Sequence, residues 1–321
     1  MARVTTGARL HFGFQNLSLA HERLYGGVGV ALADPELVVT ADCAESTVCA
    51  DAAARPYVES AVEYLGVPGA DVTVERPLPR HAGLGSGTQL ALASLVAVAR
   101  AYDRSVDPRE AAPALGRGGR SGVGVAAFER GGFVVDGGHP TERFTSAPPD
   151  PGAWAVPPVV ARHELPTDWR FVLAIPDTDP GKSGDEEDES MRSVVERADP
   201  GIGEDIARLV TQELLPAAAT ADRRAFGDAV ARLGRLNGAW YADEQGGVYR
   251  PPAGRIVDRL STTPLVTGTG QSSWGPTVYA LTGADHADTV ADAARDALAD
   301  VGAEGRVLVT GPRNEGATVE R

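Results

Sequence analysis

A glycine-rich turn between a short strand pattern and a long apolar helix pattern constrains this chain most. The turn reads PRHAGLGSGTQ at residues 79–89, and residues 71–75 before it alternate as in a β-strand. Residues 88–102 after it are apolar on nearly every side, which predicts a helix buried inside a domain. Glycine adopts positive φ without strain, so such a turn can point backbone N–H groups inward at a helix start. The pattern predicts an anion-binding loop, although a tight turn closed by an N-cap hydroxyl explains it as well.

The loop also contains side chains that an anion site would use. Ser86 and Thr88 place hydroxyls where they could contact phosphate oxygens, and Ser86 is a candidate Mg²⁺ ligand. The other candidate binding groups of the loop are the backbone amides of Gly83, Leu84, Gly85, Gly87 and Gln89.

The chain is long enough for two domains, since it has 321 residues and single domains usually hold about 100–200. Strand and helix patterns mix in both halves, which predicts an α+β fold with antiparallel pairing. A proline-rich, weakly patterned stretch at 146–158 is the best linker candidate, because prolines favour extended chain. We therefore expect one domain at residues 1–150 and a second at 151–321.

Charge and cysteine content limit the classes of partner. With 30 basic and 44 acidic residues, the net charge of −14 argues against general affinity for nucleic acid or anionic membranes. The two cysteines, Cys43 and Cys49, lack metal-site spacing and fit a reducing compartment. The sequence shows neither a signal-peptide core nor an apolar stretch approaching the roughly 18 residues of a membrane span. We expect a cytoplasmic protein.

A second glycine-rich segment, GTGQSSWGPT at residues 268–277, lies between strand patterns at 264–267 and 278–281. By itself it predicts a hairpin loop with one packed aromatic side chain. Its occurrence together with the first loop favours a binding role. The candidate binding residues in this segment are Gly270, Gln271, Ser272 and Ser273.

Polar residues elsewhere are candidates for catalysis and binding. Arg9 and His11 occupy alternate positions of a strand pattern, which predicts a shared polar face. Asp136 and His139 follow a buried-type strand, where Asp136 could ligate Mg²⁺, although an Asx-turn with a surface histidine fits equally well. Arg120 could bind a carboxylate or a phosphate, or be an ordinary surface arginine.

The segment PGKSGDEEDES contains the only lysine of the chain, Lys182, ahead of five acidic residues at 185–189. An acidic run is usually a solvated face, and acids are favourable near a helix N-terminus. The alternative is a mobile lid in which Lys182 contacts phosphate and the acids help to hold Mg²⁺.

In their order and spacing, the two glycine-rich segments resemble the second and third motifs of the GHMP superfamily of small-molecule kinases, and residues 9–32 resemble the first. This resemblance spans almost the whole chain. It implies an N-terminal domain similar to domain 2 of ribosomal protein S5, a ferredoxin-like C-terminal domain, and a site between them. Kinases of the superfamily carry a catalytic Asp in a segment that matches residues 121–124 here, and the matching position is Gly124.

Within the superfamily, the chain is most similar to the β-ribofuranosylaminobenzene 5′-phosphate synthase family. This resemblance rests on RLHFGF at 9–14, GLGSGTQ at 83–89, RSGVGVAAFERGGFVVDGG at 120–138 and QSSWGPT at 271–277. It implies that phosphoribosyl pyrophosphate and 4-amino- or 4-hydroxybenzoate give an aryl C-riboside phosphate, CO₂ and pyrophosphate, in methanopterin-type cofactor synthesis. It also implies a homodimer.

In that reaction the 4-substituent pushes electron density to the carboxyl-bearing carbon, which attacks the ribosyl C1, and decarboxylation restores aromaticity. We expect the diphosphate to bind at the first loop, with Arg9 and Lys182 as further candidate binding residues and Mg²⁺ as counter-ion. Catalytic roles are expected for Asp136, His139, His11 and Arg120. Two alternatives stay open: an ATP-dependent kinase in which Asp136 or an acid of 185–189 replaces the missing base, and a non-catalytic protein that binds a phosphate ligand.

Overall fold

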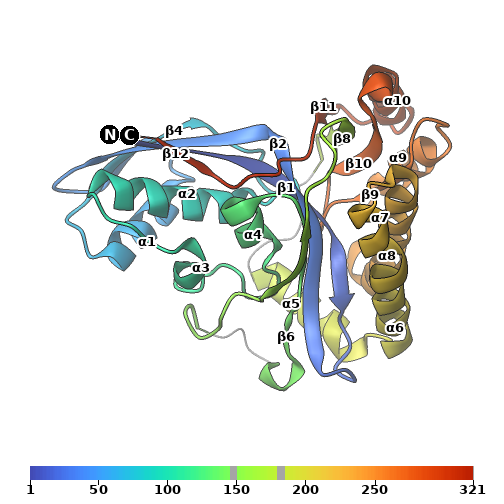
Figure 1. The fold of residues 1–321 in the computed structure, drawn as a ribbon, viewed down its shortest axis with the longest axis horizontal. Coiled ribbons are helices and arrows are strands. Elements are labelled where there is room, and N and C mark those ends of the chain that lie inside the picture. Colours follow the sequence, from blue (N-terminus) through green and yellow to red (C-terminus); the bar gives the residue numbers. More distant parts are fainter. Residues whose placement is uncertain (145–149, 179–184, 321) are drawn as a thin grey trace.

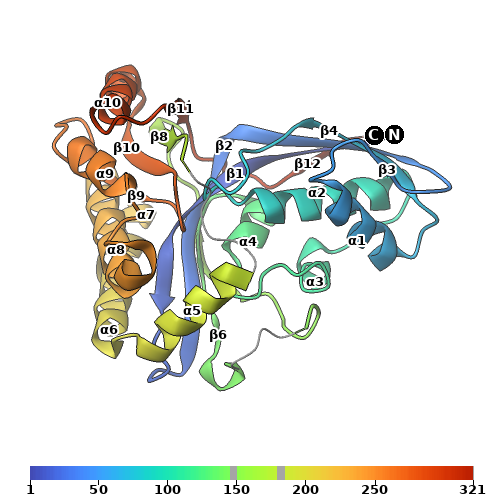
Figure 2. The same cartoon turned by 180° about the vertical axis from the view of Figure 1, so that it is seen from behind.

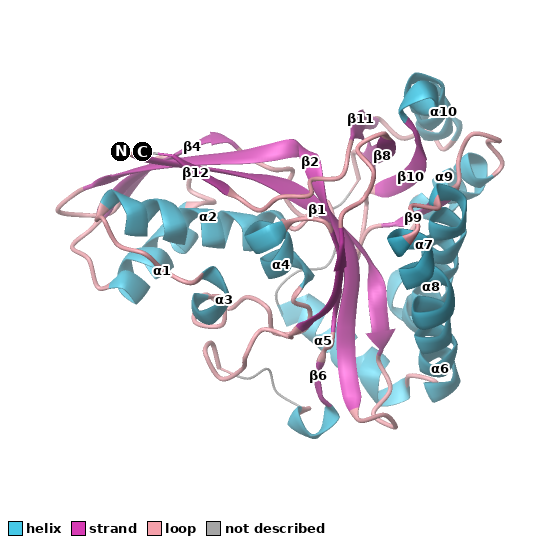
Figure 3. Ribbon diagram, in the orientation of Figure 1, coloured by secondary structure: helices cyan, strands magenta, loops and turns pink. Residues whose placement is uncertain are grey.

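The computed structural model describes residues 1–144, 150–178 and 185–320. It consists of two α+β halves that lie side by side, each a sheet with helices packed on it (Figure 1). The long hairpin of β1 (Ala2–Asn16) and β2 (Arg23–Cys43) extends from the far end of the first half to the boundary between the halves (Figure 3). The expected α+β class with antiparallel pairing is confirmed.

The first sheet is built on this hairpin, whose two strands pair antiparallel over almost their whole length. Its order is β12-β1-β2-β4-β3, with β5 and β6 pairing to the N-terminal part of β2, and β7 pairing to β5. The remaining strands are β3 (Val48–Cys49), β4 (Ala70–Arg76), β5 (Phe133–Asp136), β6 (His139–Pro140), β7 (Val159–His163) and β12 (Thr318–Glu320).

The helices of the first half lie on one side of this sheet (Figure 1). They are α1 (Arg55–Leu65), α2 (Ser86–Ala101), α3 (Pro108–Ala111) and α4 (Val123–Arg130). The predicted buried helix is α2, which packs against the sheet, α1 and α4. Its apolar surface runs nearly all round because it has neighbours on several sides.

The second sheet is antiparallel throughout, in the order β11-β8-β10-β9. Its strands are β8 (Trp169–Pro176), β9 (Gly268–Gln271), β10 (Val278–Gly283) and β11 (Gly305–Thr310). Its helices are α5 (Asp185–Arg197), α6 (Pro200–Leu209), α7 (Leu215–Ala219), α8 (Arg223–Gln245), α9 (Ala253–Ser261) and α10 (Ala287–Asp300), with a π-helical turn at Val210–Leu214. Helices between β8 and β9, and again between β10 and β11, give the predicted ferredoxin-like βαββαβ order.

One strand expectation in this half is wrong. The strand lies at 268–271 rather than 264–267, so the glycines that suggested a loop belong to β9. A Cβ on Gly268 would lie 2.2 Å from the carbonyl oxygen of Gly227 on α8. These glycines therefore mark a close approach of a strand to a helix, and the turn begins only at Ser272.

The change of sheet occurs between β7 and β8. Although β7 follows residue 150, it pairs with β5 of the first sheet, and β12 returns to pair with β1 near the N-terminus (Figure 1). Of the proline-rich segment, residues 146–149 lie outside the described part, whereas Val156 is buried.

A shared hydrophobic core joins the halves. Phe12 of β1 contacts rings of the second half, with centroid distances of 5.1 Å to Tyr279, 6.2 Å to Phe226 and 6.4 Å to Phe171. A smaller core lies between the other face of the second sheet and helices α9 and α10. Among the described helices, none combines the length and apolarity that crossing a membrane requires.

Candidate active site

The first glycine-rich loop opens α2, as predicted. Gly83 and Gly85 have φ angles of 77° and 79°, and Gly85 occupies the N-cap position. Residues 86–88 form the first turn and are half-buried. Their N–H groups are those that an α-helix leaves without intrahelical partners, so this end of α2 can receive an anion.

Arg9 of β1 lies over this loop. Its backbone N–H donates to the Leu84 carbonyl at 3.1 Å, and its guanidinium donates to the Gly83 carbonyl at 2.5 Å. A Cβ on Gly85 would be 2.9 Å from the Arg9 Cγ, so the close approach needs glycine. Burial lowers the pKa of Arg9 to about 10, with Glu187 opposing the shift. Arg9 therefore remains a cation at neutral pH.

The second glycine-rich segment supports the first. The Ser272 hydroxyl donates to the Gly83 carbonyl at 2.7 Å, and the Thr277 hydroxyl donates to the Ala82 carbonyl at 2.5 Å. Both hydroxyls are buried, and each reaches across the boundary between the halves. Ser272 therefore holds the predicted anion loop in place through the Gly83 carbonyl.

Of the other predicted residues of the second segment, some pack against the first half or the sheet, and some line a cavity. Ser273 donates its N–H to the His11 carbonyl at 3.0 Å. A Cβ on Gly270 would lie 2.7 Å from the Tyr279 hydroxyl, so this glycine permits close packing. Gln271 and Ser273 line the cavity described next.

A cavity of about 840 Å³ lies between the halves. Its lining comes from β1, β2, the first turn of α2, residues 116–121, β6, α5, α8 and the turn after β9. Helix α5 crosses in front of the β1–β2 hairpin in this region (Figure 2). The predicted site residues that line the cavity are Arg9, His11, Thr88, Arg120, His139, Gln271 and Ser273.

Two residues of the predicted loop are structural. Leu84 belongs to the hydrophobic core. Gln89 is fully buried, where it accepts from the Thr6 hydroxyl at 2.7 Å and donates to the Gly124 carbonyl at 2.8 Å. Lys182, the remaining candidate for phosphate binding, lies outside the described residues.

Four further arginines line the cavity with Arg9: Arg117, Arg120, Arg143 and Arg192. Arg117 lies over the ring of Tyr57, 5.1 Å from its centroid, and its Nε is buried with no hydrogen-bond partner among the described residues. Arg120 pairs with Glu187 at 2.9 Å and also with Asp188, both on α5. The cavity thus offers several cationic groups to an anionic ligand.

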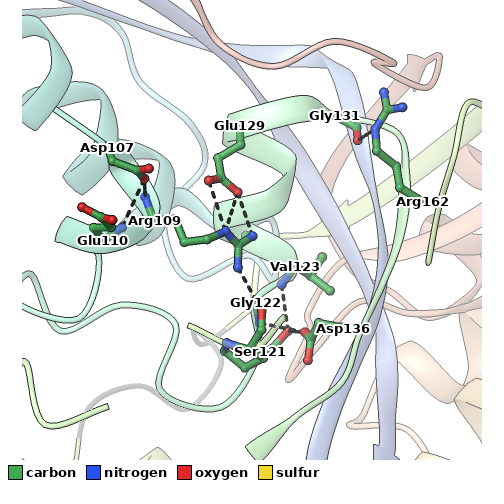
Figure 4. Close-up of polar contacts among 12 residues, drawn as sticks. Asp107, Arg109, Glu110, Ser121, Gly122, Val123, Glu129, Gly131, Asp136 and Arg162 are labelled. Atoms are coloured by element: carbon green, nitrogen blue, oxygen red, sulfur yellow. Dashed lines mark hydrogen bonds and ion pairs between the residues drawn. The ribbon is translucent and has the colours of Figure 1, made fainter. Parts of the chain in front are cut away.

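Asp136 is fully buried and organises the segment that begins with Ser121 (Figure 4). Its carboxylate accepts from the N–H of Gly122 at 2.7 Å, the N–H of Gly138 at 2.9 Å and the Ser121 hydroxyl at 3.0 Å. Burial raises the pKa of Asp136, and these donors oppose the rise. Asp136 does not line the cavity, and its expected roles in catalysis and Mg²⁺ binding stay predictions.

His11 is linked to this carboxylate through Ser121. The His11 Nε2 lies 3.2 Å from the Ser121 hydroxyl, which donates its single hydrogen to Asp136. Nε2 therefore carries the hydrogen of the neutral ring and donates to Ser121. Burial, followed by the charge of Arg9, lowers the pKa of His11 to about 3, so the ring is neutral at physiological pH.

Gly124 is the position that the resemblance to the kinases of the superfamily matches to their catalytic Asp. A Cβ on Gly124 would lie 3.2 Å from the Thr88 Cγ2 and 3.5 Å from its hydroxyl. The missing carboxylate would therefore face the first turn of α2, where Thr88 lines the cavity. In this chain, the atom that an added Cβ would approach most closely is the methyl carbon of Thr88.

Several cavity residues escaped the sequence analysis. Arg117 lies in the repetitive stretch GRGGR, where nothing distinguishes it from a surface arginine. Tyr25 has a positive φ of 68°, rare for a residue with a side chain, and the only sequence signal is the Gly-Gly pair after it. Tyr241 and Trp274, with ring centroids 4.7 Å apart, come together only in the folded chain.

A family model matches part of each half of the chain. The model of the GHMP kinases N terminal domain matches residues 50–132, and that of the GHMP kinases C terminal domain matches residues 214–300. The chain is 35% identical to the beta-ribofuranosylphenol 5′-phosphate synthase of Methanothermobacter thermautotrophicus, covering 98% of this chain and 97% of that protein. It is 36% identical to the protein of the same name from Archaeoglobus fulgidus, with complete coverage of both.

Solved structures agree on the fold. The mevalonate pyrophosphate decarboxylase of Streptococcus pyogenes matches with a TM-score of 0.68 at 12% identity, covering 98% of this chain and 97% of that one. The galactokinase of Lactococcus lactis matches with a TM-score of 0.67 at 13% identity, covering 98% of this chain and 94% of that one. The chain has the two-domain GHMP fold, and it belongs to the beta-ribofuranosylphenol 5′-phosphate synthase family of enzymes within the GHMP superfamily.

Proposed function

We propose that this protein joins phosphoribosyl pyrophosphate to the carboxyl-bearing ring carbon of 4-hydroxybenzoate, releasing CO₂ and pyrophosphate. The product would be an aryl C-riboside 5′-phosphate, in a pathway of methanopterin-type cofactor synthesis. Full-length similarity to relatives named for a ribofuranosylphenol phosphate supports this reaction and favours 4-hydroxybenzoate over 4-aminobenzoate as acceptor.

The structural observation that carries this proposal is the absence of an unpaired carboxylate from the described lining of the cavity. The position matched to the kinases' base is Gly124, beside Thr88, and the carboxylates that line the cavity among the described residues are Glu187 and Asp188. Both are paired with Arg120. A reaction in which no alcohol attacks a phosphorus atom needs no base at position 124.

The arginines suit the leaving group of the proposed reaction. Pyrophosphate departs with several negative charges, and fixed cations and helix N-termini stabilise charge that develops in a transition state. Arg9, Arg117 and the first turn of α2 lie together, since a Cβ on Gly87 would be 3.3 Å from the Arg117 Nη1. We assign the diphosphate to this end of the cavity.

Mg²⁺ fits this assignment as an ion bound mainly by the substrate. Among the residues that the structure describes, no group of three or more His, Cys, Asp or Glu side chains could hold a metal. Mg²⁺ commonly binds through substrate phosphates, waters and only one or two carboxylates, and Glu187 and Asp188 could supply these. When bound, the ion would neutralise diphosphate charge. Removal of Mg²⁺ by a chelator should then weaken binding of the diphosphate substrate, measured by calorimetry.

The test is product analysis by mass spectrometry. Protein, Mg²⁺ and phosphoribosyl pyrophosphate are mixed with 4-hydroxybenzoate or 4-aminobenzoate carrying ¹³C in the carboxyl group. We expect labelled CO₂ and an aryl riboside phosphate, with much less product from an Arg120→Gln variant than from the control Arg224→Gln, at an exposed site on α8.

Other outcomes would favour the competing functions. Phosphate transfer from ATP to a small hydroxy acid, without riboside formation, would favour a kinase. Thermal stabilisation by phosphoribosyl pyrophosphate without release of pyrophosphate would favour a binding protein. The homodimer and the cytoplasmic location stay predictions.

A further inference from the structure

A row of four rings forms part of the cavity wall. His11 and Phe14 of β1 have ring centroids 4.9 Å apart, Phe14 and Tyr25 of β2 are 5.7 Å apart, and Tyr25 and His139 of β6 are 6.4 Å apart. All four residues line the cavity. A flat aromatic ligand can pack against such a row by offset or edge contacts.

The row ends at a buried histidine with an unused nitrogen. His139 is only 8% exposed, and its Nε2 is buried with no hydrogen-bond partner among the described residues. Against the larger effect of burial, the backbone of Gly118 and Gly119 acts on the ring and raises its pKa. Because Nε2 has no partner, a carbonyl group that accepts from this ring must accept from Nδ1, which places the hydrogen of the neutral ring there.

Burial and the neighbouring charges keep the His139 ring neutral. Burial lowers the pKa of His139, and the nearby charges of Arg143 and Arg23 lower it further against the backbone bonds. In a neutral ring with the hydrogen on Nδ1, the Nε2 carries a lone pair and can only accept. A buried acceptor without a donor is costly, so a ligand that supplies an O–H or N–H group would bind favourably here.

We propose that the Nε2 of His139 accepts the hydrogen of the 4-hydroxyl group of the aryl acceptor. This inference rests on the proposed function and assigns a catalytic residue to it. The hydroxyl is para to the carbon that forms the new bond, so binding the hydroxyl at His139 directs that carbon towards the opposite end of the ring row. His11 lies at that end, next to Arg9 in the strand that covers the diphosphate loop.

Tyr25 lies within the ring row, between Phe14 and His139. Burial raises the pKa of its hydroxyl and Arg120 opposes the rise, so the middle of the ring row lies near a cation of the cavity. The aryl ring would lie against Phe14 and Tyr25, with its carboxylate within reach of this charge. His11 is a poorer candidate for the same task, because its Nε2 already donates to Ser121.

The proposed step transfers one proton to His139 and later returns it. The hydroxyl hydrogen moves to His139 while the ring carbon attacks the ribosyl C1 and the bond from C1 to the diphosphate oxygen breaks. The electrons of the ring–carboxylate bond then restore the aromatic ring as CO₂ leaves. The phenolate oxygen takes the proton back from His139, so no net proton is gained or lost by the enzyme. Arg143 and Arg23 favour the phenolate by their charge.

The first experiment compares variants in turnover of 4-hydroxybenzoate. His139→Phe keeps the ring and removes the lone pair, and His139→Gln keeps a polar acceptor; His286→Gln, a partly exposed site in the second half, is the control. General-base assistance commonly contributes about 10²–10⁴-fold, so we expect kcat/KM to fall by at least about 10²-fold in His139→Phe and by less in His139→Gln. Equal activity of His139→Phe and the control would overturn the inference and leave the proposed function intact.

The second experiment needs no turnover. Binding of 4-hydroxybenzoate and of 4-fluorobenzoate, which has no hydroxyl hydrogen, is measured by calorimetry in the absence of phosphoribosyl pyrophosphate. We expect wild type to prefer the hydroxyl compound by about tenfold or more, as one hydrogen bond to a buried group can provide. We expect His139→Phe to lose this preference. A wild type without the preference refutes the inference even if His139 variants fold poorly.

Discussion

Replacing Gly83 with alanine should destabilise this protein more than any ordinary loop substitution. Gly83 has a φ of 77°, and a Cβ there would lie 2.2 Å from the carbonyl oxygen of Ser272. Positive φ alone costs a residue with a side chain about 1–2 kcal/mol. The contact would in addition force the loop away from Ser272 and Arg9, both of which donate to the Gly83 carbonyl, and each lost bond costs about 1–2 kcal/mol. We expect a loss of about 3–6 kcal/mol in the free energy of unfolding.

Gly66 provides the matched control, because it has a φ of 59° but no atom within 4 Å of an added Cβ. Gly66→Ala should therefore lose only the backbone term, about 1–2 kcal/mol. Both variants can be compared with wild type by urea unfolding followed by circular dichroism and tryptophan fluorescence. If Gly83→Ala loses no more stability than Gly66→Ala, the two glycine-rich segments are not held together as described.

Three further outcomes are expected. Asp136→Asn should lower the free energy of unfolding by about 1–3 kcal/mol, because an amide NH₂ cannot accept from the Ser121 hydroxyl. If chemical denaturation gives the variant the same free energy of unfolding as wild type, this hydrogen-bond network is refuted. His11 has a pKa of about 3 when folded and an ordinary value near 6.5, so the unfolded chain binds a proton that the folded chain does not between these values. Stability should thus fall as pH drops through this window, and less so in His11→Gln; parallel pH profiles would contradict the assignment. Glu187→Gln should remove one of the two carboxylates paired with Arg120, leaving Asp188, and tighten pyrophosphate binding by up to about fivefold in calorimetry, whereas weaker binding would show that the carboxylate itself helps to hold the ligand.

The anion loop and the polar face of β1 could be predicted because each is a local pattern. The spacing of glycines before an apolar helix indicates where α2 starts, and alternation along the strand places Arg9 and His11 on the cavity side. Resemblance to the GHMP superfamily supplied the order of the elements, which local patterns do not contain.

Long-range packing explains what the sequence could not show. Gly268 suggested a turn, although it is glycine because α8 lies against β9. The donors to the Asp136 carboxylate, which are the Ser121 hydroxyl and the N–H groups of Gly122 and Gly138, come together only in the fold. Arg117 and Tyr25 have no sequence feature that separates them from surface residues, and only the closure of the two halves places them in one cavity.

The pairing of β12 with β1 has a consequence for how the protein is made. Arg3 lies opposite Glu320, so the outer edge of β1 at residues 3–5 stays uncovered during synthesis until residues 318–320 have been made. During synthesis this edge presents free N–H and C=O groups to other nascent chains. A chain stalled before residue 318 would contain every residue that lines the cavity but would leave the sheet edge at residues 3–5 open, and we expect it to aggregate rather than to lose its ability to bind substrate.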